Sequence, residues 1–170
     1  MAWPSHPSSS GSCLQHPGQW TTGSPTGFTA VTIIGPYSRP TEDTAANKAQ
    51  RVERIEQALQ SGDSDKVLEG KVARAVADDV IDFNRKVGPH GATGEVDVET
   101  RQAIIEVTTR RMGKAKQIHK LLSNPEMNPS GKPVILFAPN YGHTATKTIT
   151  DAGAVVVRTV AELLAILSKL

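Results

Sequence analysis

Acidic side chains recur at alternate positions in residues 94–110, whose sequence is GEVDVETRQAIIEVTTR. Strand side chains point alternately to two faces, so this pattern is typical of two short strands joined by a turn. A turn centred on Arg101 and Gln102 places Asp97 directly opposite Glu106 on the neighbouring strand. Opposed residues in such a pair have Cβ atoms roughly 4.5–5.5 Å apart. The spacing therefore predicts two carboxylates that are close enough to act together.

Two carboxylates at that separation repel each other unless a cation lies between them. Mg²⁺ is commonly held by one or two carboxylates together with substrate phosphates. We therefore interpret Asp97 and Glu106 as a metal site for cleaving phosphodiester bonds, with Mg²⁺, Mn²⁺ or Zn²⁺ as the ion. The alternative is the solvated acidic face of an ordinary hairpin, on which Glu95 and Glu99 also lie. Periodicity alone favours that alternative.

Charge is distributed unevenly along the chain, although the formal net charge is only +2. Residues 61–100 hold nine acidic and five basic side chains, whereas residues 101–120 hold six basic side chains and one acidic side chain. A basic segment next to an acidic pair suits a metal site that acts on a polyanion, and a solvated basic helix is the alternative. The candidate phosphate contacts in this segment are Arg110, Arg111, Lys114 and Lys120.

Composition excludes several classes of protein. The single cysteine, Cys13, rules out an intramolecular disulfide framework and a cysteine-rich zinc site. The apolar runs are too short to cross a bilayer, and no secretory signal pattern is present. The sequence therefore predicts a soluble protein with no membrane segment, working in a reducing compartment.

The N-terminal part differs in composition from the rest of the chain. Residues 1–40 are dominated by Ser, Gly, Pro, Thr and Gln, which cannot bury enough apolar surface to order a segment. We expect a flexible leader or linker there, with one short strand at residues 29–34 (TAVTII). Residues 41–170 are long enough for one domain with a core.

Apolar periodicity predicts the elements around the acidic hairpin. Residues 44–60 form a helix, Ser64 caps a second helix, and a strand lies around residues 80–83. A further helix at residues 114–123 follows the hairpin, with Lys116 on its outer side. The hairpin is therefore expected between helices.

The last third of the chain predicts strands alternating with helices. Residues 134–138 are a continuous apolar run, as expected for a strand covered on both faces, and residues 154–157 are another apolar strand. Thr144 is predicted to cap the helix between them, and Thr159 with Glu162 fits a capping box before the last helix. Strand–helix–strand units imply parallel, right-handed crossovers. The whole is predicted to be an α/β fold whose mixed sheet is flanked by helices, antiparallel at the hairpin and parallel beyond it.

This order of elements, with the acidic pair, resembles the restriction-endonuclease-like PD-(D/E)XK nuclease superfamily over roughly residues 65–138. GEVD resembles the strand that carries the metal-binding aspartate, giving Asp97, and IIEVT resembles the next strand, giving Glu106. Glu69 in LEGKVARAVA resembles the glutamate that many members add from the first helix. The resemblance implies a metal held by Glu69, Asp97 and Glu106.

The chain departs from this family at the third position of the triplet, where Thr108 stands in place of lysine. In the family that lysine positions or activates the attacking water. Lys114 or Lys116 on the following helix could supply the ammonium group, and Lys116 is the slightly preferred candidate. Alternatively, the Thr108 hydroxyl could orient the water.

A narrower resemblance concerns the layout of leader, nuclease domain and tail. It is similar to the C-terminal toxin domains of contact-dependent growth inhibition and related polymorphic toxin systems. Such a domain would be delivered into the cytoplasm of a target cell from a secreted or cell-surface precursor and would cleave tRNA or DNA. The resemblance also implies a cognate immunity protein.

Two alternatives to a nuclease remain open. Thr108 favours a catalytically degenerate nucleic-acid-binding module of the same fold. A Rossmann-like nucleotide-binding protein ranks last because no GxGxxG or Walker loop is present. Tyr141 and His143 follow a predicted strand and could stack on a base and contact a phosphate, but local packing of this loop is the slightly favoured interpretation.

Overall fold

A five-stranded mixed sheet forms the centre of the computed structural model, which describes residues 43–170. The leader predicted for residues 1–40 and the strand predicted at residues 29–34 lie outside the described residues. The strand order is β1-β2-β3-β4-β5, with β1–β2 and β2–β3 antiparallel and β3–β4 and β4–β5 parallel. The strands are β1 (Val80–Val87), β2 (Gly94–Thr100), β3 (Ile104–Val107), β4 (Val134–Phe137) and β5 (Val155–Val157).

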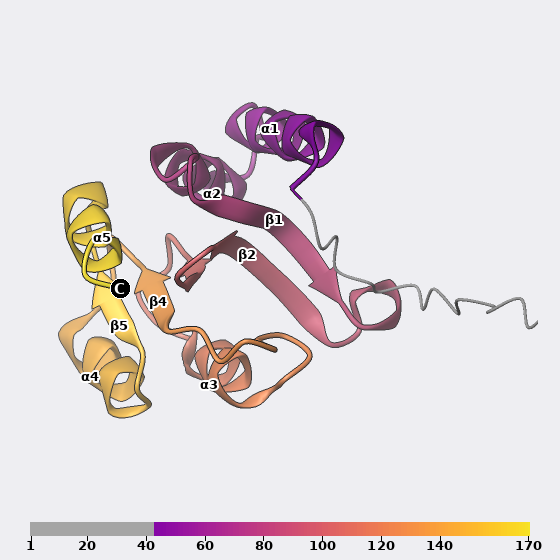
Figure 1. Ribbon diagram of the computed structural model, residues 1–170. Coiled ribbons are helices and arrows are strands. Elements are labelled where there is room, and N and C mark those ends of the chain that lie inside the picture. The colour runs from indigo at the N-terminus through magenta and orange to yellow at the C-terminus, as the bar shows by residue number, and fades with distance from the viewer. Residues whose placement is uncertain (1–42) are drawn as a thin grey trace, which may run out of the picture. The chain divides into compact units, whose positions relative to one another are not determined.

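Helices flank both faces of this sheet (Figure 1). They are α1 (Ala45–Leu59), α2 (Ser64–Ala75), α3 (Ala115–Ser123), α4 (His143–Asp151) and α5 (Val160–Leu167), with a short 3₁₀ turn, η1 (Pro89–Gly91), between β1 and β2. Helices α3 and α4 connect parallel strands, as the sequence predicted. The α/β class and the mixed sheet flanked by helices are therefore confirmed.

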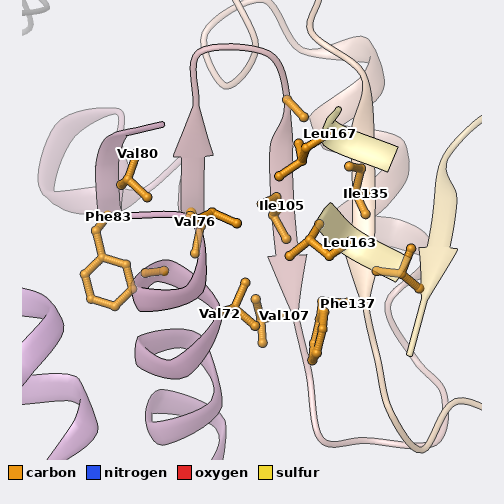
Figure 2. Close-up of a cluster of buried hydrophobic side chains, with 14 of the residues drawn as sticks. Val72, Val76, Val80, Phe83, Ile105, Val107, Ile135, Phe137, Leu163 and Leu167 are labelled. Carbon is orange, nitrogen blue, oxygen red and sulfur yellow. The ribbon is translucent and has the colours of Figure 1, made fainter. Parts of the chain in front are cut away.

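Each face of the sheet has its own hydrophobic cluster. The cluster on one face joins α1, α2 and α5 to the sheet (Figure 2). In it, Val72 of α2 and Leu163 of α5 pack with Ile105 and Val107 of β3. The second cluster joins α3 and α4 to the other face, through side chains such as Ile118. Residues of β3 that alternate along the strand therefore belong to opposite clusters.

Several predicted element boundaries were wrong. Helix α2 is capped by Asp63 and not by Ser64, because the Asp63 carboxylate accepts a hydrogen bond from Asp65 N at 2.8 Å. Helix α4 begins one residue before Thr144, with Gly142 at its N-cap. Strand β1 runs to Val87 and pairs with β2 up to that residue, so it is longer than the segment predicted around residues 80–83.

The register of β2 and β3 agrees with the predicted hairpin. Val98 pairs with Ile105 and Glu99 pairs with Ile104, so the hairpin is centred between residues 101 and 102. Continuing this register by one residue puts Asp97 opposite Glu106. No helix among residues 43–170 has the length and apolar character needed to cross a bilayer.

Candidate functional site

Strands β2 and β3 are linked at Asp97 by a side chain instead of a backbone contact. Val107 N donates a hydrogen bond to Asp97 Oδ2 at 2.8 Å. In a regular antiparallel ladder with this register, the Val107 amide would face the backbone of Val96. The carboxylate therefore enters the ladder, and it lies where the paired region of the two strands ends.

Glu106 lies completely buried beside Asp97, and both of its oxygens are engaged by α3. Lys114 Nζ donates to Glu106 Oε1, and Gln117 Nε2 donates to Glu106 Oε2 at 2.8 Å. Lys114 Nζ also lies 3.3 Å from Gln117 Oε1. Because Lys114 is the N-cap of α3 and Gln117 is three residues later, the two side chains leave the same side of the first turn.

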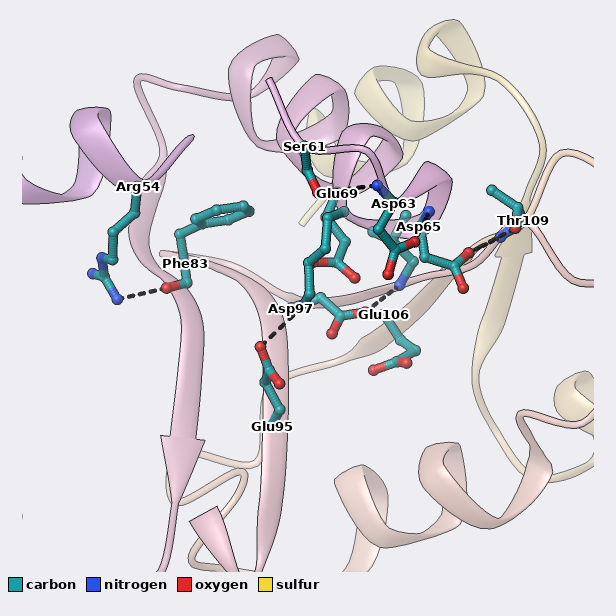
Figure 3. Close-up of polar contacts among 12 residues, drawn as sticks. Arg54, Ser61, Asp63, Asp65, Glu69, Phe83, Glu95, Asp97, Glu106 and Thr109 are labelled. Carbon is teal, nitrogen blue, oxygen red and sulfur yellow. Dashed lines mark hydrogen bonds and ion pairs between the residues drawn. The ribbon is translucent and has the colours of Figure 1, made fainter. Parts of the chain in front are cut away.

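A third carboxylate comes from α2, where Glu69 is buried at 4% exposure. Figure 3 shows Glu69, Asp97 and Glu106 with their carboxylates grouped beside the strands. Lys66 Nζ bridges Glu69 Oε2, at 2.9 Å, and Glu95 Oε1, at 3.2 Å. The three carboxylates that the resemblance implied as metal ligands therefore lie near one another, with Lys66 beside Glu69 and Lys114 beside Glu106.

A cleft of about 530 Å³ opens above this group of carboxylates. Its walls come from the start of α2, the start of β2, α3 and the loop after α3. Lys114, Lys116 and Lys120 all line it, so three of the predicted cations lie beside the acidic group. The complete lining is Asp63, Asp65, Lys66, Glu69, Gly94, Glu95, Asp97, Lys114, Lys116, Gln117, Lys120 and Met127.

Burial and mutual repulsion raise the pKa values of the three carboxyls. Burial, followed by the charge of Asp97, raises the pKa of Glu69 to about 7. Burial and the neighbouring Glu106 raise the pKa of Asp97, even though the Val107 amide favours its charged form. Burial also raises the pKa of Glu106, and the adjacent Lys114 offsets only part of that effect. Such a group binds a cation more favourably than isolated surface carboxylates do.

Two of these carboxylates are already paired with lysines, Glu106 with Lys114 and Glu69 with Lys66. Burial lowers the pKa of Lys114, but the charge and hydrogen bond of Glu106, together with the charges of Asp97 and Asp65, outweigh it and raise that pKa. Glu69 has the same effect on the pKa of Lys66. Electrostatics therefore keep both ammonium groups protonated inside the site.

Lys114 occupies the place beside Glu106 that the sequence assigned with slight preference to Lys116. Lys116 is exposed and lines the cleft further out. Thr108 is completely buried, and its Oγ1 accepts a hydrogen bond from Arg110 N at 3.2 Å. This hydroxyl therefore stabilises the turn after β3 and does not line the cleft.

The loop between β3 and α3 is fixed at both ends. Asp65 accepts from Thr109 N at 2.8 Å and from Thr109 Oγ1 at 2.7 Å, and these bonds, the backbone one first, lower the pKa of Asp65. At the other end, Lys114 N donates to the Tyr141 hydroxyl at 3.1 Å. Gly113, at a φ of 99°, makes the turn into α3. The loop therefore presents Lys114 from a fixed backbone.

Other predicted contacts take different places in the structure. Tyr141 is 5% exposed within the second hydrophobic cluster, so its ring is not available for stacking on a base, and the local-packing interpretation holds. His143 is exposed at the start of α4. Arg110 and Arg111 are exposed on the β3–α3 loop. None of these four described residues lines the cleft.

The alternative of a solvated acidic face, which included Glu99, is wrong for this residue. It is 1% exposed, and its oxygens accept from Lys132 Nζ at 2.9 Å and from Arg85 Nη2 at 3.1 Å. Lys132 lies 33 residues away in the chain, so no local pattern identifies it. Glu99 thus belongs to a buried ion-pair network that ties β1, β2 and the loop before β4 together.

Sequence reasoning also missed Lys66 and Gln117. Gln117 follows Lys114 by three residues, a spacing that places both on one helical face. Lys66 precedes Glu69 by three residues in the same way. These spacings are present in the sequence, but they identify Lys66 and Gln117 as site residues only when α2 and α3 are known to lie beside the same carboxylates.

The donor chemistry of this site fits a hard divalent cation, because carboxylate oxygens are the ligands that Mg²⁺ and Mn²⁺ prefer. Within residues 43–170, however, no three His, Cys, Asp or Glu side chains converge in a ready-made metal-binding arrangement. Asp97 and Glu69 line the cleft, whereas Glu106 is covered by Lys114 and Gln117. A cation entering from the cleft would therefore meet Asp97 and Glu69 before Glu106.

None of the protein-family models, curated proteins or solved structures compared with this chain matches it. The functional conclusion therefore depends on the geometry and electrostatics of the site.

Proposed function

We propose that the protein is a divalent-metal-dependent nuclease that hydrolyses phosphodiester bonds. The observation that carries this proposal is the proximity of the Asp97 and Glu106 carboxylates on adjacent strands β2 and β3, next to Glu69 and beside a lysine-lined cleft. Carboxylates with raised pKa values in a cleft are typical of functional sites. A structural ion-pair network would not need to leave Asp97 and Glu69 facing a cleft.

Each side chain has a definite role in this proposal. Asp97 and Glu69 would hold the divalent ion, which when bound supplies Lewis-acid stabilisation of the charge that develops on the phosphate. Lys114 lies where its ammonium group can stabilise that charge or orient the attacking water, the role of the lysine that Thr108 replaces. Lys116 and Lys120, on the cleft side of α3, would contact the flanking phosphates.

We also propose a superfamily and a biological role for the protein. The order of elements and the carboxylate positions support membership of the PD-(D/E)XK superfamily, with Lys114 as a lysine displaced from strand to helix. The layout of the chain supports a toxin domain that cleaves tRNA or DNA in the cytoplasm of a target cell. That assignment implies an immunity protein, whose binding to this chain is a separate test.

Incubation with total tRNA, and separately with plasmid DNA, tests the proposed activity. We expect products in the presence of Mg²⁺ and none in the presence of EDTA. Asp97→Asn, which keeps an acceptor for Val107 N, and Glu106→Gln should each abolish cleavage while circular dichroism shows a retained fold. Retained turnover in both variants would contradict the assignment.

A nucleic-acid-binding module without turnover is the second candidate. The observation that favours it is the engagement of both Glu106 oxygens by Lys114 and Gln117, which leaves that carboxylate neutralised without any metal. This candidate predicts metal-independent binding that weakens steeply with salt. Any EDTA-sensitive product from tRNA or plasmid would rule it out.

A further inference from the structure

Glu106 already has a cation. Lys114 Nζ holds its Oε1, and Gln117 holds its Oε2 at 2.8 Å. Glu106 is 0% exposed, so water cannot take the place of either partner without a rearrangement of α3. A divalent ion can therefore reach this carboxylate only by displacing the Lys114 ammonium group.

Glu69 is different, because Lys66 leaves part of it available. Lys66 Nζ contacts only Oε2 of Glu69, and it is shared with Glu95 on β2. Asp97 accepts from the Val107 amide through Oδ2 and faces the cleft. An ion in the cleft can thus be held by Asp97 and Glu69 while Lys66 and Lys114 keep their places.

The net charge of the carboxylates and lysines in the site is consistent with one bound divalent ion. Glu69, Glu95, Asp97 and Glu106 supply four negative charges when ionised, and Lys66 and Lys114 supply two positive charges, which leaves two net negative charges. One divalent ion brings this group to neutrality. A second divalent ion would leave an excess of positive charge in a buried site, which is costly unless it is paired.

We propose that Lys114 is a resident cation that competes with divalent ions for Glu106, so that the site takes a single divalent ion on Asp97 and Glu69. This inference deepens the proposed nuclease function and rests on the same site. In this arrangement Lys114 lowers the affinity of the site for divalent ions and also contributes to catalysis. Removing its charge must therefore change metal binding and cleavage in opposite directions.

Titration of the full-length protein with Mn²⁺ in a calorimeter tests this inference without any substrate. The wild-type chain should bind one ion in the site, and Asp97→Asn, which keeps an acceptor for Val107 N, should lose that ion. Lys114→Gln should lower the Mn²⁺ dissociation constant roughly tenfold or more, because a positive charge next to Glu106 is removed. Lys114→Arg, which keeps the charge, should bind Mn²⁺ within about twofold of wild type.

Lys71→Gln is the matched control, because Lys71 is an exposed lysine on α2, the helix that carries Glu69. It removes the same charge away from the carboxylates and should leave the dissociation constant within about twofold of wild type. Two site-bound ions in the wild type would overturn the inference, as would unchanged or weaker Mn²⁺ binding in folded Lys114→Gln. If Lys114→Gln does not fold, the number of Mn²⁺ ions that the wild-type protein binds in the site still tests the inference.

Cleavage assays on the same proteins separate this inference from the proposed function. Tighter Mn²⁺ binding in Lys114→Gln together with at least tenfold slower cleavage supports both. Tighter binding in a protein whose wild type cleaves neither tRNA nor DNA supports the resident cation and contradicts the nuclease.

Discussion

The Val107 amide donates its hydrogen bond to the carboxylate of Asp97, at 2.8 Å, at the point where the pairing of β2 with β3 ends. This bond fixes the direction of the Asp97 side chain relative to Glu106 on the next strand. It also makes Asp97 a structural residue as well as a candidate ligand. Variants of Asp97 must therefore preserve the acceptor if they are to report on chemistry alone.

The stability of the metal-free protein should fall as the pH rises from about 5 to about 8. Asp97 and Glu69 hold their protons in the folded state up to pKa values of about 8 and about 7, whereas their unfolded reference values are 3.8 and 4.5. Between these limits the folded chain binds more protons than the unfolded chain, so the free energy of unfolding decreases with pH. Urea denaturation at a series of pH values measures this slope.

Asp97→Asn is the control for that pH dependence, because the amide keeps an oxygen acceptor for Val107 N but does not ionise. The slope between pH 5 and 8 should be shallower in this variant. Adding Mg²⁺ to the wild type should restore stability most strongly at the upper end of the range. A slope identical in both proteins would show that Asp97 is ionised throughout.

Tyr141→Phe should weaken the placement of Lys114. The change removes only the hydroxyl that accepts from Lys114 N at 3.1 Å, and it leaves the ring in the hydrophobic cluster. We expect a loss of about 0.5–1.5 kcal/mol in the free energy of unfolding. We also expect kcat to fall several-fold with little change in KM, because Lys114 contributes to the reaction and not to substrate affinity. A change confined to KM would contradict this placement.

Glu99→Gln should destabilise the fold by about 3–5 kcal/mol, because it leaves Arg85 and Lys132 beside a neutral group in a buried position. The matched control is Asp79→Asn, which removes one partner of the exposed pair with Arg101. That pair is 41% and 59% exposed, so its loss should cost less than about 1 kcal/mol. Equal losses in the free energy of unfolding of the two variants, measured by denaturation, would show that burial does not increase the contribution of the Glu99 network to stability.

Lys120→Ala should weaken nucleic-acid binding without changing the cleavage rate at saturating substrate. Lys120 lines the cleft but makes none of the contacts to Glu106 that Lys114 makes. If it contacts one phosphate, the slope of log affinity against log salt should become shallower by about 1. Titration of a labelled oligonucleotide at several salt concentrations gives that slope, and an unchanged slope would remove Lys120 from the interface.

The hairpin and its register could be predicted from the sequence because they depend on local rules. Alternation of side chains and the position of the turn place Asp97 opposite Glu106 with no knowledge of the rest of the chain. The continuous apolar runs likewise identified β4 and β5 as strands, and β4 is covered on both faces as predicted, whereas Val155 of β5 is exposed. Local periodicity was sufficient for these elements.

Partners that come from distant segments could not be predicted in the same way. The choice between Lys114 and Lys116 depends on the residue at which α3 begins, and the Tyr141 hydroxyl that fixes this start lies 27 residues further along the chain. The burial of Glu99 could not be predicted, because its cationic partners, Arg85 and Lys132, come from a neighbouring strand and a remote loop. Burial at these positions is set by tertiary packing, which periodicity does not encode.

Single-turnover cleavage by isosteric variants tests the central claim most directly. Asp97→Asn and Glu106→Gln remove charge with little change of shape, and Asp151→Asn, at an exposed position on α4, is the matched control. With Mg²⁺ and the substrate identified from tRNA or plasmid, both site variants should bind that substrate yet cleave it at least a hundredfold more slowly, a difference of about 2.7 kcal/mol in activation free energy. The control should cleave at the wild-type rate. Cleavage by Asp97→Asn and Glu106→Gln at that same rate would contradict the assignment of this carboxylate pair to phosphodiester hydrolysis.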